Sequence, residues 1–474
     1  MNYEINEAIQ FFIDKMLREN QPKTVIDAFV RYYGNVCRGE SGCIAENEIV
    51  PVAANEFDDY SQIEDKDGAG QAALPRAVVI KLNGGLGTSM GLHAAKSLIP
   101  VKNGLTFLDI TALQIREFNK RFGISIPLIM MNSFKTEHDS LEALSQYSDI
   151  KTDIPLSFVQ HKFPRIRAID LMPVECKTNP QLEWNPPGHG DLYAAILTSG
   201  VLDMLLNKGY RYAFISNIDN LDAALDMRIL GYFASKEIPF LMEVTERTFM
   251  DRKGGHLARL KNGKLILREA AQCPAEDVES FRDTSIHRYF NTNNLWIRLD
   301  ALKEAWDNGT LELPMIRNMK KVDTHECGGK PESLDVFQLE SAMGTAISVF
   351  ENAEALRIPR SRFAPVKNCE DLLLLWSDYY ELTDDYRVMM SPRHKSTQMD
   401  VNLDQRFYRT LDQLKERFPN GAPSLAECYS FSISGDVRFG RNVIATGNVS
   451  IINTKNTQAF IGDGERLTGE VILK

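Results

Sequence analysis

Histidine and cysteine are scarce and scattered in this chain of 474 residues, and their scatter excludes several kinds of site. The eight histidines never form the HExxH pair that holds zinc on a helix. The seven cysteines are odd in number and never spaced as CxxC, so neither a zinc site nor a disulfide framework is expected. We therefore expect reduced thiols and a cytoplasmic protein.

The sequence also lacks an excess of positive charge and any long apolar run. Lysine and arginine number 54 against 64 aspartates and glutamates, and the net charge is −10. That balance argues against nonspecific binding to nucleic acid or to an anionic membrane. The opening MNYEINEAIQFF carries acids where a signal peptide needs basic residues, and no apolar run approaches transmembrane length. We expect neither nucleic acid nor membrane as a partner.

The most informative segment is a glycine-rich loop directly after a buried apolar strand. The strand AVVI is followed by residues 81–98, KLNGGLGTSMGLHAAKSL. Gly84, Gly85 and Gly87 carry no Cβ, so backbone N–H groups there can approach an anion closely. The spacing matches neither GxxxxGK[ST] nor GxGxxG, and the loop ends by delivering Lys96. The alternative is a structural turn followed by a surface lysine.

Apolar strands and amphipathic helices alternate after this loop. Strands are expected over residues 126–131, 211–216 and 239–244, and helices after Thr106 and over residues 191–206. This alternation predicts an α/β fold with a mostly parallel, doubly wound sheet. An Asn-Gly pair within HLARLKNGKLILRE predicts a hairpin inside the same region.

The end of the chain changes character. Val437, Val443 and Val449 are six residues apart, and after a polar position at Lys455 the frame resumes at Ile461, Leu467 and Leu473. A six-residue apolar period is typical of a β-helix, and the alternative is a plain antiparallel meander. We expect three parts: residues 1–76 as a helical segment with an acidic linker, residues 77–385 as the catalytic α/β domain, and residues 386–474 as a linker and β-helix domain.

Polar residues that follow the predicted strands are candidates for ligand binding, because ligands bind at the carboxyl ends of such strands. Asp219 follows the 211–216 strand, and a carboxylate there is able to hold Mg²⁺. His189 lies between two glycines in PPGHGD, and Asn293 lies in NTNNLW, where amides suit sugar hydroxyls. Each of these residues has a simpler alternative as a turn cap or a surface residue.

A cluster of basic residues surrounds Pro365 in RSRFAPVK. In an acidic chain, Arg360, Arg362 and Lys367 are a candidate clamp for a triphosphate. The alternative is an exposed basic turn.

A series of motifs stands in a fixed order along the chain, namely LNGGLGTSMG with Lys96, MMNSF, FVQ, PPGHGD, SNIDNL, MEVT, KGG, FNTNNLW and PRSRFAPVK. This series resembles the UTP–glucose-1-phosphate uridylyltransferases (UDP-glucose pyrophosphorylases) of the eukaryotic type, from about residue 77 to the end. The resemblance implies a nucleotidyltransferase-type, Rossmann-like α/β core and a C-terminal left-handed β-helix. The N-terminal helix and the linker over residues 47–74 match the family only weakly.

The resemblance also implies a role for each matching residue. Nucleotide binding is implied for Leu82, Asn83, Gly84, Gly85, Gln160, Gly188 and Asn217. Sugar binding is implied for Gly85, His189, Asn217 and Asn293. Catalytic contacts with phosphate are implied for Lys96 and Lys367, and Mg²⁺ binding for Asp219.

The implied reaction is uridylyl transfer from UTP to glucose 1-phosphate, which yields UDP-glucose and pyrophosphate. The sugar phosphate is largely a dianion at neutral pH, so it supplies the nucleophile, and catalysis needs positioning and charge neutralisation. Two alternatives remain open, a uridylyltransferase for galactose 1-phosphate or a wider set of sugar phosphates, and a catalytically silent nucleotide-sugar sensor. Self-association through the C-terminal β-helix is a hypothesis.

Overall fold

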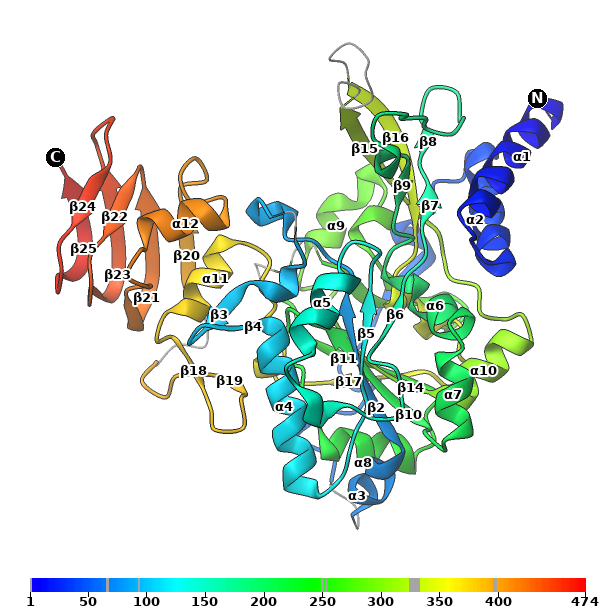
Figure 1. Ribbon diagram of the computed structural model, residues 1–474, viewed down its shortest axis with the longest axis horizontal. Coiled ribbons are helices and arrows are strands. Elements are labelled where there is room, and N and C mark those ends of the chain that lie inside the picture. Colours follow the sequence, from blue (N-terminus) through cyan, green and yellow to red (C-terminus); the bar gives the residue numbers. More distant parts are fainter. Residues whose placement is uncertain are drawn as a thin grey trace.

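The computed structural model describes residues 2–64, 68–92, 94–248, 251, 254–323, 333–394 and 399–474. An N-terminal pair of helices lies at one end of the molecule, a central sheet flanked by helices forms the middle, and a stack of strands lies at the other end (Figure 1). The KGG motif of the series, residues 253–255, falls partly outside the described residues, because Lys253 is not among them.

The α-helices are α1 (Asn2–Arg18), α2 (Lys23–Cys37), α3 (Ala69–Ala73), α4 (Phe107–Phe122), α5 (Glu137–Leu144), α6 (Leu192–Thr198), α7 (Val201–Asn207), α8 (Met227–Ser235), α9 (Val278–Arg282), α10 (Leu299–Asp307), α11 (Cys369–Trp376) and α12 (Leu411–Arg417). The central sheet contains β1 (Ile49–Pro51), β2 (Ala77–Asn83), β5 (Leu128–Asn132), β6 (Ser157–Val159), β10 (Tyr212–Asn217), β11 (Phe240–Glu246), β12 (His256–Leu260), β13 (Leu265–Arg268), β14 (Tyr289–Arg298) and β17 (Glu354–Arg357).

The remaining strands form smaller sheets. They are β3 (Pro100–Lys102), β4 (Leu105–Thr106), β7 (Phe163–Pro164), β8 (Ile166–Arg167), β9 (Trp184–Asn185), β15 (Ile316–Asp323), β16 (Ser333–Glu340), β18 (Tyr380–Leu382), β19 (Val388–Met390), β20 (Asp400–Leu403), β21 (Ser424–Ser434), β22 (Val437–Phe439), β23 (Ile444–Asn453), β24 (Ala459–Ile461) and β25 (Arg466–Leu473). The β15–β16 hairpin projects from the body of the molecule (Figure 1).

The central sheet is parallel in one half and mixed in the other. Strands β6, β5, β2 and β10 pair in parallel, as the βαβ pattern predicts. Strand β14 runs antiparallel to both β10 and β11, and β12 pairs antiparallel with β13 and β14. The expected α/β fold with a mainly parallel central sheet is therefore confirmed, and the antiparallel strands are confined to the half that contains β12, β13 and β14.

Alternate residues of β2 point to opposite faces of the sheet, and both faces are buried. Val79 packs in a core that contains α4 and α8, whereas Val78 and Ile80 pack in a second core that contains α6 and α7. All seven residues of β2 are buried, which explains its continuous apolar run. Burial on both faces fixes the position of the loop that leaves the end of this strand.

Local sequence signals set several element boundaries. Thr106 caps α4 and forms a capping box with Asp109, as expected for this pair. Gly263 has φ +90° at the hairpin that joins β12 to β13. The single helix predicted over residues 191–206 is instead divided, because Gly200 with φ +75° separates α6 from α7.

The C-terminal strands stack in parallel. Strands β20, β21, β23 and β25 form one parallel sheet and β22 pairs in parallel with β24, so the alternative of an antiparallel meander is wrong. The residues of the six-residue period that are buried here are Val437, Val443, Val449, Ile461 and Leu467. These aliphatic side chains therefore lie inside the module. The left-handed winding of a β-helix stays a prediction.

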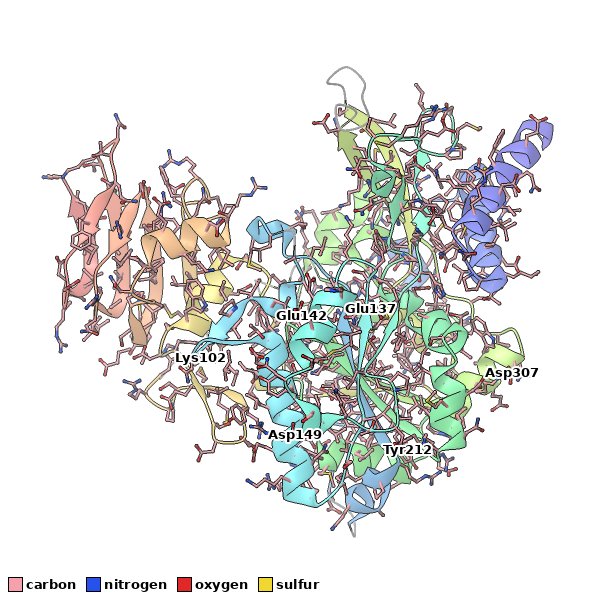
Figure 2. All side chains as sticks on the ribbon, in the orientation of Figure 1. Lys102, Glu137, Glu142, Asp149, Tyr212 and Asp307 are labelled. Atoms are coloured by element: carbon pink, nitrogen blue, oxygen red, sulfur yellow. The ribbon has the colours of Figure 1, made fainter. Side chains whose placement is uncertain are left out.

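Helix α11 connects the C-terminal module to the central domain. Lys102 of β3, labelled in Figure 2, donates from Nζ to the carbonyls of Leu375 (3.1 Å) and Ser377 (2.5 Å) at the end of α11. The indole of Trp376 donates to the carbonyl of Pro100 at 2.9 Å. The helix is thus held against the strand that follows the glycine-rich loop.

The cysteines depart from one expectation. Cys176 is buried and disulfide-bonded, which corrects the expectation that all thiols are reduced. Cys37, Cys43, Cys273, Cys369 and Cys428 are free. Within the described ranges, no helix combines the length and the apolar character that crossing a membrane requires.

Candidate functional site

Amide side chains end four neighbouring parallel strands. Asn83 ends β2, Asn132 ends β5, Asn217 ends β10, and Gln160 directly follows β6. The carboxyl ends of these strands lie at one edge of the sheet, here called the site edge. Amides donate and accept hydrogen bonds in fixed geometry, so this edge is suited to bases and sugars.

The glycine-rich loop passes over the site edge close to Gln160. A Cβ at Gly84 would lie 2.6 Å from Nε2 of Gln160, which is closer than real Cβ atoms approach. A Cβ at Gly85 would meet no atom within 4 Å, so open space lies beside this glycine. The carbonyl of Gly85 accepts from the N–H of Lys96 at 3.1 Å, which closes the loop on itself.

Lys96 joins three segments of the chain. Its ammonium group donates to Oδ2 of Asp219 and to the carbonyl of Val366. The N–H of Val366 donates in turn to the carbonyl of Asp219 at 3.2 Å. The loop after β2, the loop after β10 and the turn before α11 therefore converge on one lysine and one carboxylate, and the roles of Lys96 toward phosphate and of Asp219 toward Mg²⁺ stay predictions.

Asp219 has one carboxylate oxygen without a hydrogen bond, and such an oxygen is suited to bind a metal ion. Its Oδ1 is buried and accepts no hydrogen bond. The described part of the chain contains no cluster of three or more His, Cys, Asp or Glu side chains that would form an all-protein metal site. Mg²⁺ commonly uses one or two carboxylates and takes its other ligands from water and phosphate oxygens, so Asp219 fits this ion.

His189 is held as a neutral hydrogen-bond donor. Its Nδ1 accepts from the N–H of Met343 at 2.9 Å, so the ring proton belongs on Nε2. Burial lowers the pKa of His189 to about 4, which keeps the ring uncharged at neutral pH. Gly188 beside it has φ +81°, and a Cβ there would lie 2.4 Å from the carbonyl of Ser341.

A second histidine ties Gln160 to the PPGHGD turn. The N–H of His161 donates to Oδ2 of Asp191 at 2.6 Å, and its ring Nδ1 lies 2.8 Å from Oδ1 of the same carboxylate. Gln160 precedes His161, and Asp191 ends the turn that carries Gly188 and His189. The structure thus brings together the two segments that the resemblance assigns to the base.

Asn293 lies at a bulge in β14. The pairing of β14 with β11 shifts register opposite Glu243, and Asn293 has φ +58° at this point. Asn291 stabilises the bulge, because its Oδ1 accepts from the N–H of Asn293 at 3.0 Å and its Nδ2 donates to Oδ1 of Asn293 at 2.9 Å. The bulge is the reason that a strand presents several amides in succession.

Lys367 is exposed beside an aromatic ring. Its Nζ lies 5.8 Å from the centroid of the Phe290 ring, and its N–H donates to Oδ2 of Asp371 at 2.7 Å. Burial raises the pKa of Asp371, and the positive charges of Lys367 and Lys96 oppose this rise. The two predicted phosphate-binding lysines therefore act on a common carboxylate.

Comparison with known proteins decides the family. The family model described as UTP–glucose-1-phosphate uridylyltransferase matches residues 26–445. The chain belongs to this family. The uridylyltransferase of Hordeum vulgare is 41% identical over 410 residues, which are 86% of this chain and 84% of that protein. The probable uridylyltransferase of Schizosaccharomyces pombe is 38% identical over 476 residues, covering 100% of this chain and 92% of that one.

Solved structures of UDP-glucose pyrophosphorylases resemble the chain over almost its full length. A crystal structure described as UDP-glucose phosphorylase from Trypanosoma brucei has a TM-score of 0.90 at 42% identity and covers 99% of this chain and 100% of that one. A mutant UDP-glucose pyrophosphorylase from Leishmania major, in complex with UDP-glucose, has a TM-score of 0.90 at 41% identity. It covers 98% of this chain and 99% of that one.

The predicted triphosphate clamp of this uridylyltransferase family member needs correction. Arg360 pairs with the carboxylate of Asp251 at 2.7 and 3.0 Å. Arg362 is buried and pairs with Glu243 at 2.9 and 3.1 Å. Both guanidinium groups are therefore paired with protein carboxylates, Arg362 in the interior and Arg360 at an exposed position, and Lys367 is exposed as well.

The side chain of Asn83 is also committed within the protein. Its side-chain nitrogen donates to Oδ1 of Asn132 and to Oγ of Ser140, both at 2.7 Å, and its main-chain carbonyl accepts from the hydroxyl of Thr136 at 2.8 Å. These bonds hold the ends of β2 and β5 together. The nucleotide-binding role of Leu82 and Asn83 stays a prediction that would involve the backbone.

Sequence reasoning missed Lys81, a buried lysine directly beneath the site. Lys81 is 3% exposed, and its Nζ donates to Oγ of Ser216 and to the carbonyl of Ala223, both at 2.7 Å. These two bonds span the loop that carries Asn217 and Asp219. The signal in the sequence was a lysine inside the apolar run AVVIKLN, where a charge is costly to bury.

Burial and the positive charge of Arg362 lower the pKa of Lys81, Asp219 and Glu243 partly oppose this effect, and the resulting pKa is about 7. The lysine is thus balanced between its charged and neutral forms near neutral pH. A neutral amine still supplies the two donors that Ser216 and Ala223 need.

Proposed function

We propose that the chain transfers the uridylyl group of UTP to glucose 1-phosphate and releases pyrophosphate, and that it also catalyses the reverse reaction. The observation that carries the proposal is the meeting of Lys96 and Asp219 at the carboxyl ends of β2 and β10, beside a loop with open space at Gly85. Membership of the uridylyltransferase family supports the choice of nucleotide and sugar.

Each predicted residue has a chemical task in this reaction. Gln160 and the backbone of the loop bind uracil and ribose, with Gly188 on the other side of the base. Neutral His189 donates from Nε2 to the sugar or its phosphate, and Asn217 and Asn293 bind sugar hydroxyls. Lys96 neutralises charge that develops on the leaving pyrophosphate, and Lys367 holds phosphate from the opposite side.

No protein nucleophile or general base is needed. The phosphate of glucose 1-phosphate is largely dianionic at neutral pH and attacks the α-phosphorus directly, with pyrophosphate as the leaving group. The obstacle is repulsion between two polyanions in a chain whose net charge is −10. Local cations at the site edge therefore supply most of the catalysis.

Mg²⁺ is the proposed cofactor, and Asp219 is its protein ligand. When bound, this ion would neutralise phosphate charge and orient the two phosphates for in-line displacement. The unpaired and buried Oδ1 of Asp219 is the observation that supports the assignment.

The experiment is a pyrophosphate-release assay with UTP and a panel of sugar 1-phosphates. We expect release that depends on added glucose 1-phosphate and on Mg²⁺, and that is weaker with galactose 1-phosphate. An Asp219→Asn variant should require more Mg²⁺ for half-maximal rate. Binding of UDP-glucose without any turnover would identify a sensor instead, and an equal or better rate with galactose 1-phosphate would change the substrate.

The C-terminal module is the proposed site of self-association. We propose that its parallel coils wind as a left-handed β-helix, and that strand β25 offers an edge to a second copy. Phe460 and Ile472, which are exposed on this module, would add apolar contact. Light scattering at micromolar concentration tests this, and a Phe460→Asp variant should dissociate any dimer that forms. We place the protein in the cytoplasm, which fractionation of cells would test.

A further inference from the structure

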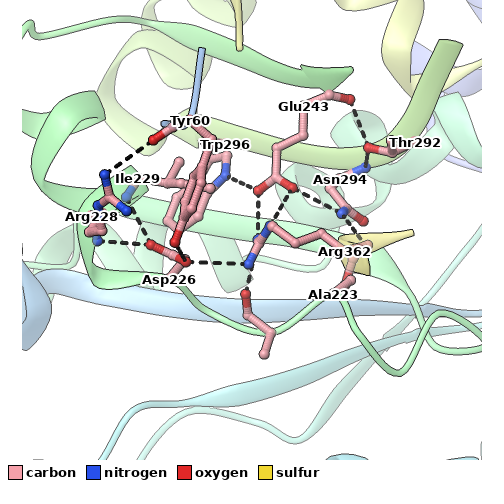
Figure 3. A network of polar contacts seen from close by, with 12 residues as sticks. Tyr60, Ala223, Asp226, Arg228, Ile229, Glu243, Thr292, Asn294, Trp296 and Arg362 are labelled. Carbon is pink, nitrogen blue, oxygen red and sulfur yellow. Dashed lines mark hydrogen bonds and ion pairs between the residues drawn. The ribbon is translucent and has the colours of Figure 1, made fainter. Parts of the chain in front are cut away.

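A fully satisfied carboxylate lies directly behind the site. Glu243 of β11 is 0% exposed, and four donors surround it (Figure 3). Oε1 accepts from the indole of Trp296 and from Nη2 of Arg362, both at 2.9 Å. Oε2 accepts from Nδ2 of Asn294 at 3.0 Å and from Nε of Arg362 at 3.1 Å. A carboxylate with four donors has one orientation available to it.

Arg362 also contacts two other segments of the chain. Its Nη2 also donates to the carbonyl of Ala224 at 3.2 Å, and its Nη1 lies 3.5 Å from Oδ2 of Asp226. Its own carbonyl accepts from Nδ2 of Asn220 at 3.2 Å. Asn220 then accepts through Oδ1 from the N–H of Ala364 at 3.1 Å. The pair therefore connects the loop after β10 with the turn that leads to α11.

Every segment that this pair joins also carries a proposed ligand residue. Asn220 directly follows Asp219, and Asn294 directly follows Asn293. The turn that begins at Arg362 leads to Val366, whose carbonyl accepts from Lys96, and then to Lys367. The network therefore includes the residue that follows the proposed metal ligand in the sequence and the residue that follows the proposed sugar ligand.

We infer that Glu243 and Arg362 are positioning residues that fix the Asp219 loop, the Asn293 bulge and the Lys367 turn relative to one another for the transfer step. The inference rests on the proposed function, because it concerns the same site. Neither side chain is expected to touch substrate, since both are buried and fully engaged with protein groups.

A lysine in place of Arg362 separates charge from geometry. An ammonium group keeps the positive charge opposite Glu243 but cannot make two parallel hydrogen bonds and also reach Ala224. Hydrogen-bonding partners behind a site typically contribute 10- to 100-fold to affinity or activity, so we expect kcat/KM of Arg362→Lys to fall roughly 10- to 100-fold. The loss should appear mainly in kcat, because the relative placement of reacting groups changes.

Arg417→Lys is the matched control. Arg417 is also buried and also pairs through Nε with a carboxylate, Asp436, at 2.9 Å, but it lies in the C-terminal module. We expect a similar fall in Tm for the two lysine variants and a loss of kcat in Arg362→Lys alone. Equal kinetics in Arg362→Lys and wild type would overturn the inference, as would an equal loss of kcat in the control.

A double-mutant cycle with Lys96 tests whether the pair acts through the site. If Arg362 positions the partners of Lys96, Arg362→Lys should lower kcat by a much smaller factor in a Lys96→Ala background than in wild type. Strictly multiplicative losses would refute a positioning role. Glu243→Gln provides a second route, and its kcat should fall by a factor similar to that of Arg362→Lys.

Wild-type protein in the same assay separates this inference from the proposed function. Turnover of UTP and glucose 1-phosphate by wild type establishes the reaction, and the ratio of variant to wild type then judges the pair. Wild-type protein without turnover would overturn both, whereas an active wild type with unaffected variants overturns only the positioning role.

Discussion

Replacing Lys81 by methionine is the sharpest test of the electrostatics beneath the site. Methionine has a similar length and no charge, and it fits a buried position without the amine. The change removes two donors at 2.7 Å from Ser216 and Ala223, and it removes a buried group whose pKa is lowered to about 7. These two consequences have opposite signs for stability.

The size of the pH effect follows from linkage. The pKa of a lysine is about 10.4 when unfolded, so between pH 7 and pH 10 the unfolded chain binds a proton at Lys81 that the folded chain has released. Stability conferred by the wild-type side chain therefore rises with pH in this window. Each pH unit is worth about 1.4 kcal/mol, and half-protonation at pH 7 reduces the gain from pH 7 to 9 to about 2 kcal/mol.

Near pH 7 the two consequences largely cancel. Relief of the buried charge stabilises Lys81→Met by roughly 3–4 kcal/mol. The unsatisfied carbonyl of Ala223 and the lost bond to Ser216 cost a comparable amount, about 1–3 kcal/mol for each group. The variant should therefore fold, and its free energy of unfolding relative to wild type should become less favourable by about 2 kcal/mol between pH 7 and pH 9.

Urea unfolding followed by circular dichroism at pH 7, 8 and 9 measures this difference. The exposed Lys455 of the C-terminal module gives the control, because Lys455→Met should show no comparable trend. A difference between Lys81→Met and wild type that stays constant over this range would mean that Lys81 remains protonated. That result would refute the balance of burial against Asp219 and Glu243 described above.

Three further predictions concern the site itself. Lys96→Ala should lower kcat about 100- to 1,000-fold with little change in Tm, as measured by pyrophosphate release and calorimetry, and near-normal turnover would remove its catalytic role. Gly84→Ala should fold, because the clash at 2.6 Å is with the flexible amide of Gln160, yet KM for UTP should rise about tenfold if that amide reads the base. The pKa of His189 is about 4 in the folded protein and higher in the unfolded chain, so the free energy of unfolding of wild type should fall by about 3 kcal/mol as the pH drops from 6.5 to 4. His189→Gln should remove this fall, as measured by urea unfolding. Parallel unfolding curves for the two proteins over that range would contradict it.

Features that depend on neighbouring residues in the sequence could be predicted. The capping box of Thr106, the hairpin at Gly263 and the six-residue burial period of the C-terminal strands all follow from short-range patterns, and all are present. The contact between Lys96 and Asp219 was not predicted, and the structure explains it, since the two residues follow adjacent parallel strands at the same edge. When two parallel strands are adjacent, the residues that follow them lie close together even if they are more than a hundred positions apart in the sequence.

Features that depend on long-range pairing could not be predicted. Arg362 and Glu243 are 119 positions apart, and no local pattern distinguishes an arginine that binds phosphate from one that pairs with a buried carboxylate. The antiparallel direction of β14 was hidden for a similar reason, because a buried strand has the same apolar run in either direction. The disulfide at Cys176 was missed because scattered cysteines carry no pairing signal.

The two layers of the site explain why its motifs are so rich in amides. In SNIDNL, Asp219 is available to a ligand while Asn220 bonds Arg362 and Ala364 within the protein. In FNTNNLW, Asn293 lies at the bulge while Asn294 bonds Glu243. If Asp219 and Asn293 have the proposed roles, each motif places one residue toward the ligand and the next residue in the support behind it.

This division has a consequence for substrate choice. Substitution of Asn293 should be able to change sugar specificity while Asn294 is kept, because Asn294 and not Asn293 makes the hydrogen bond to Glu243. Conversely, substitution of Asn294 should damage transfer for every sugar 1-phosphate to a similar extent, since the network behind the bulge does not distinguish one sugar from another. A panel of sugar 1-phosphates measured on Asn294→Ala would reveal a selective loss if Asn294 itself contacted the hexose, and a uniform loss if it supports the bulge.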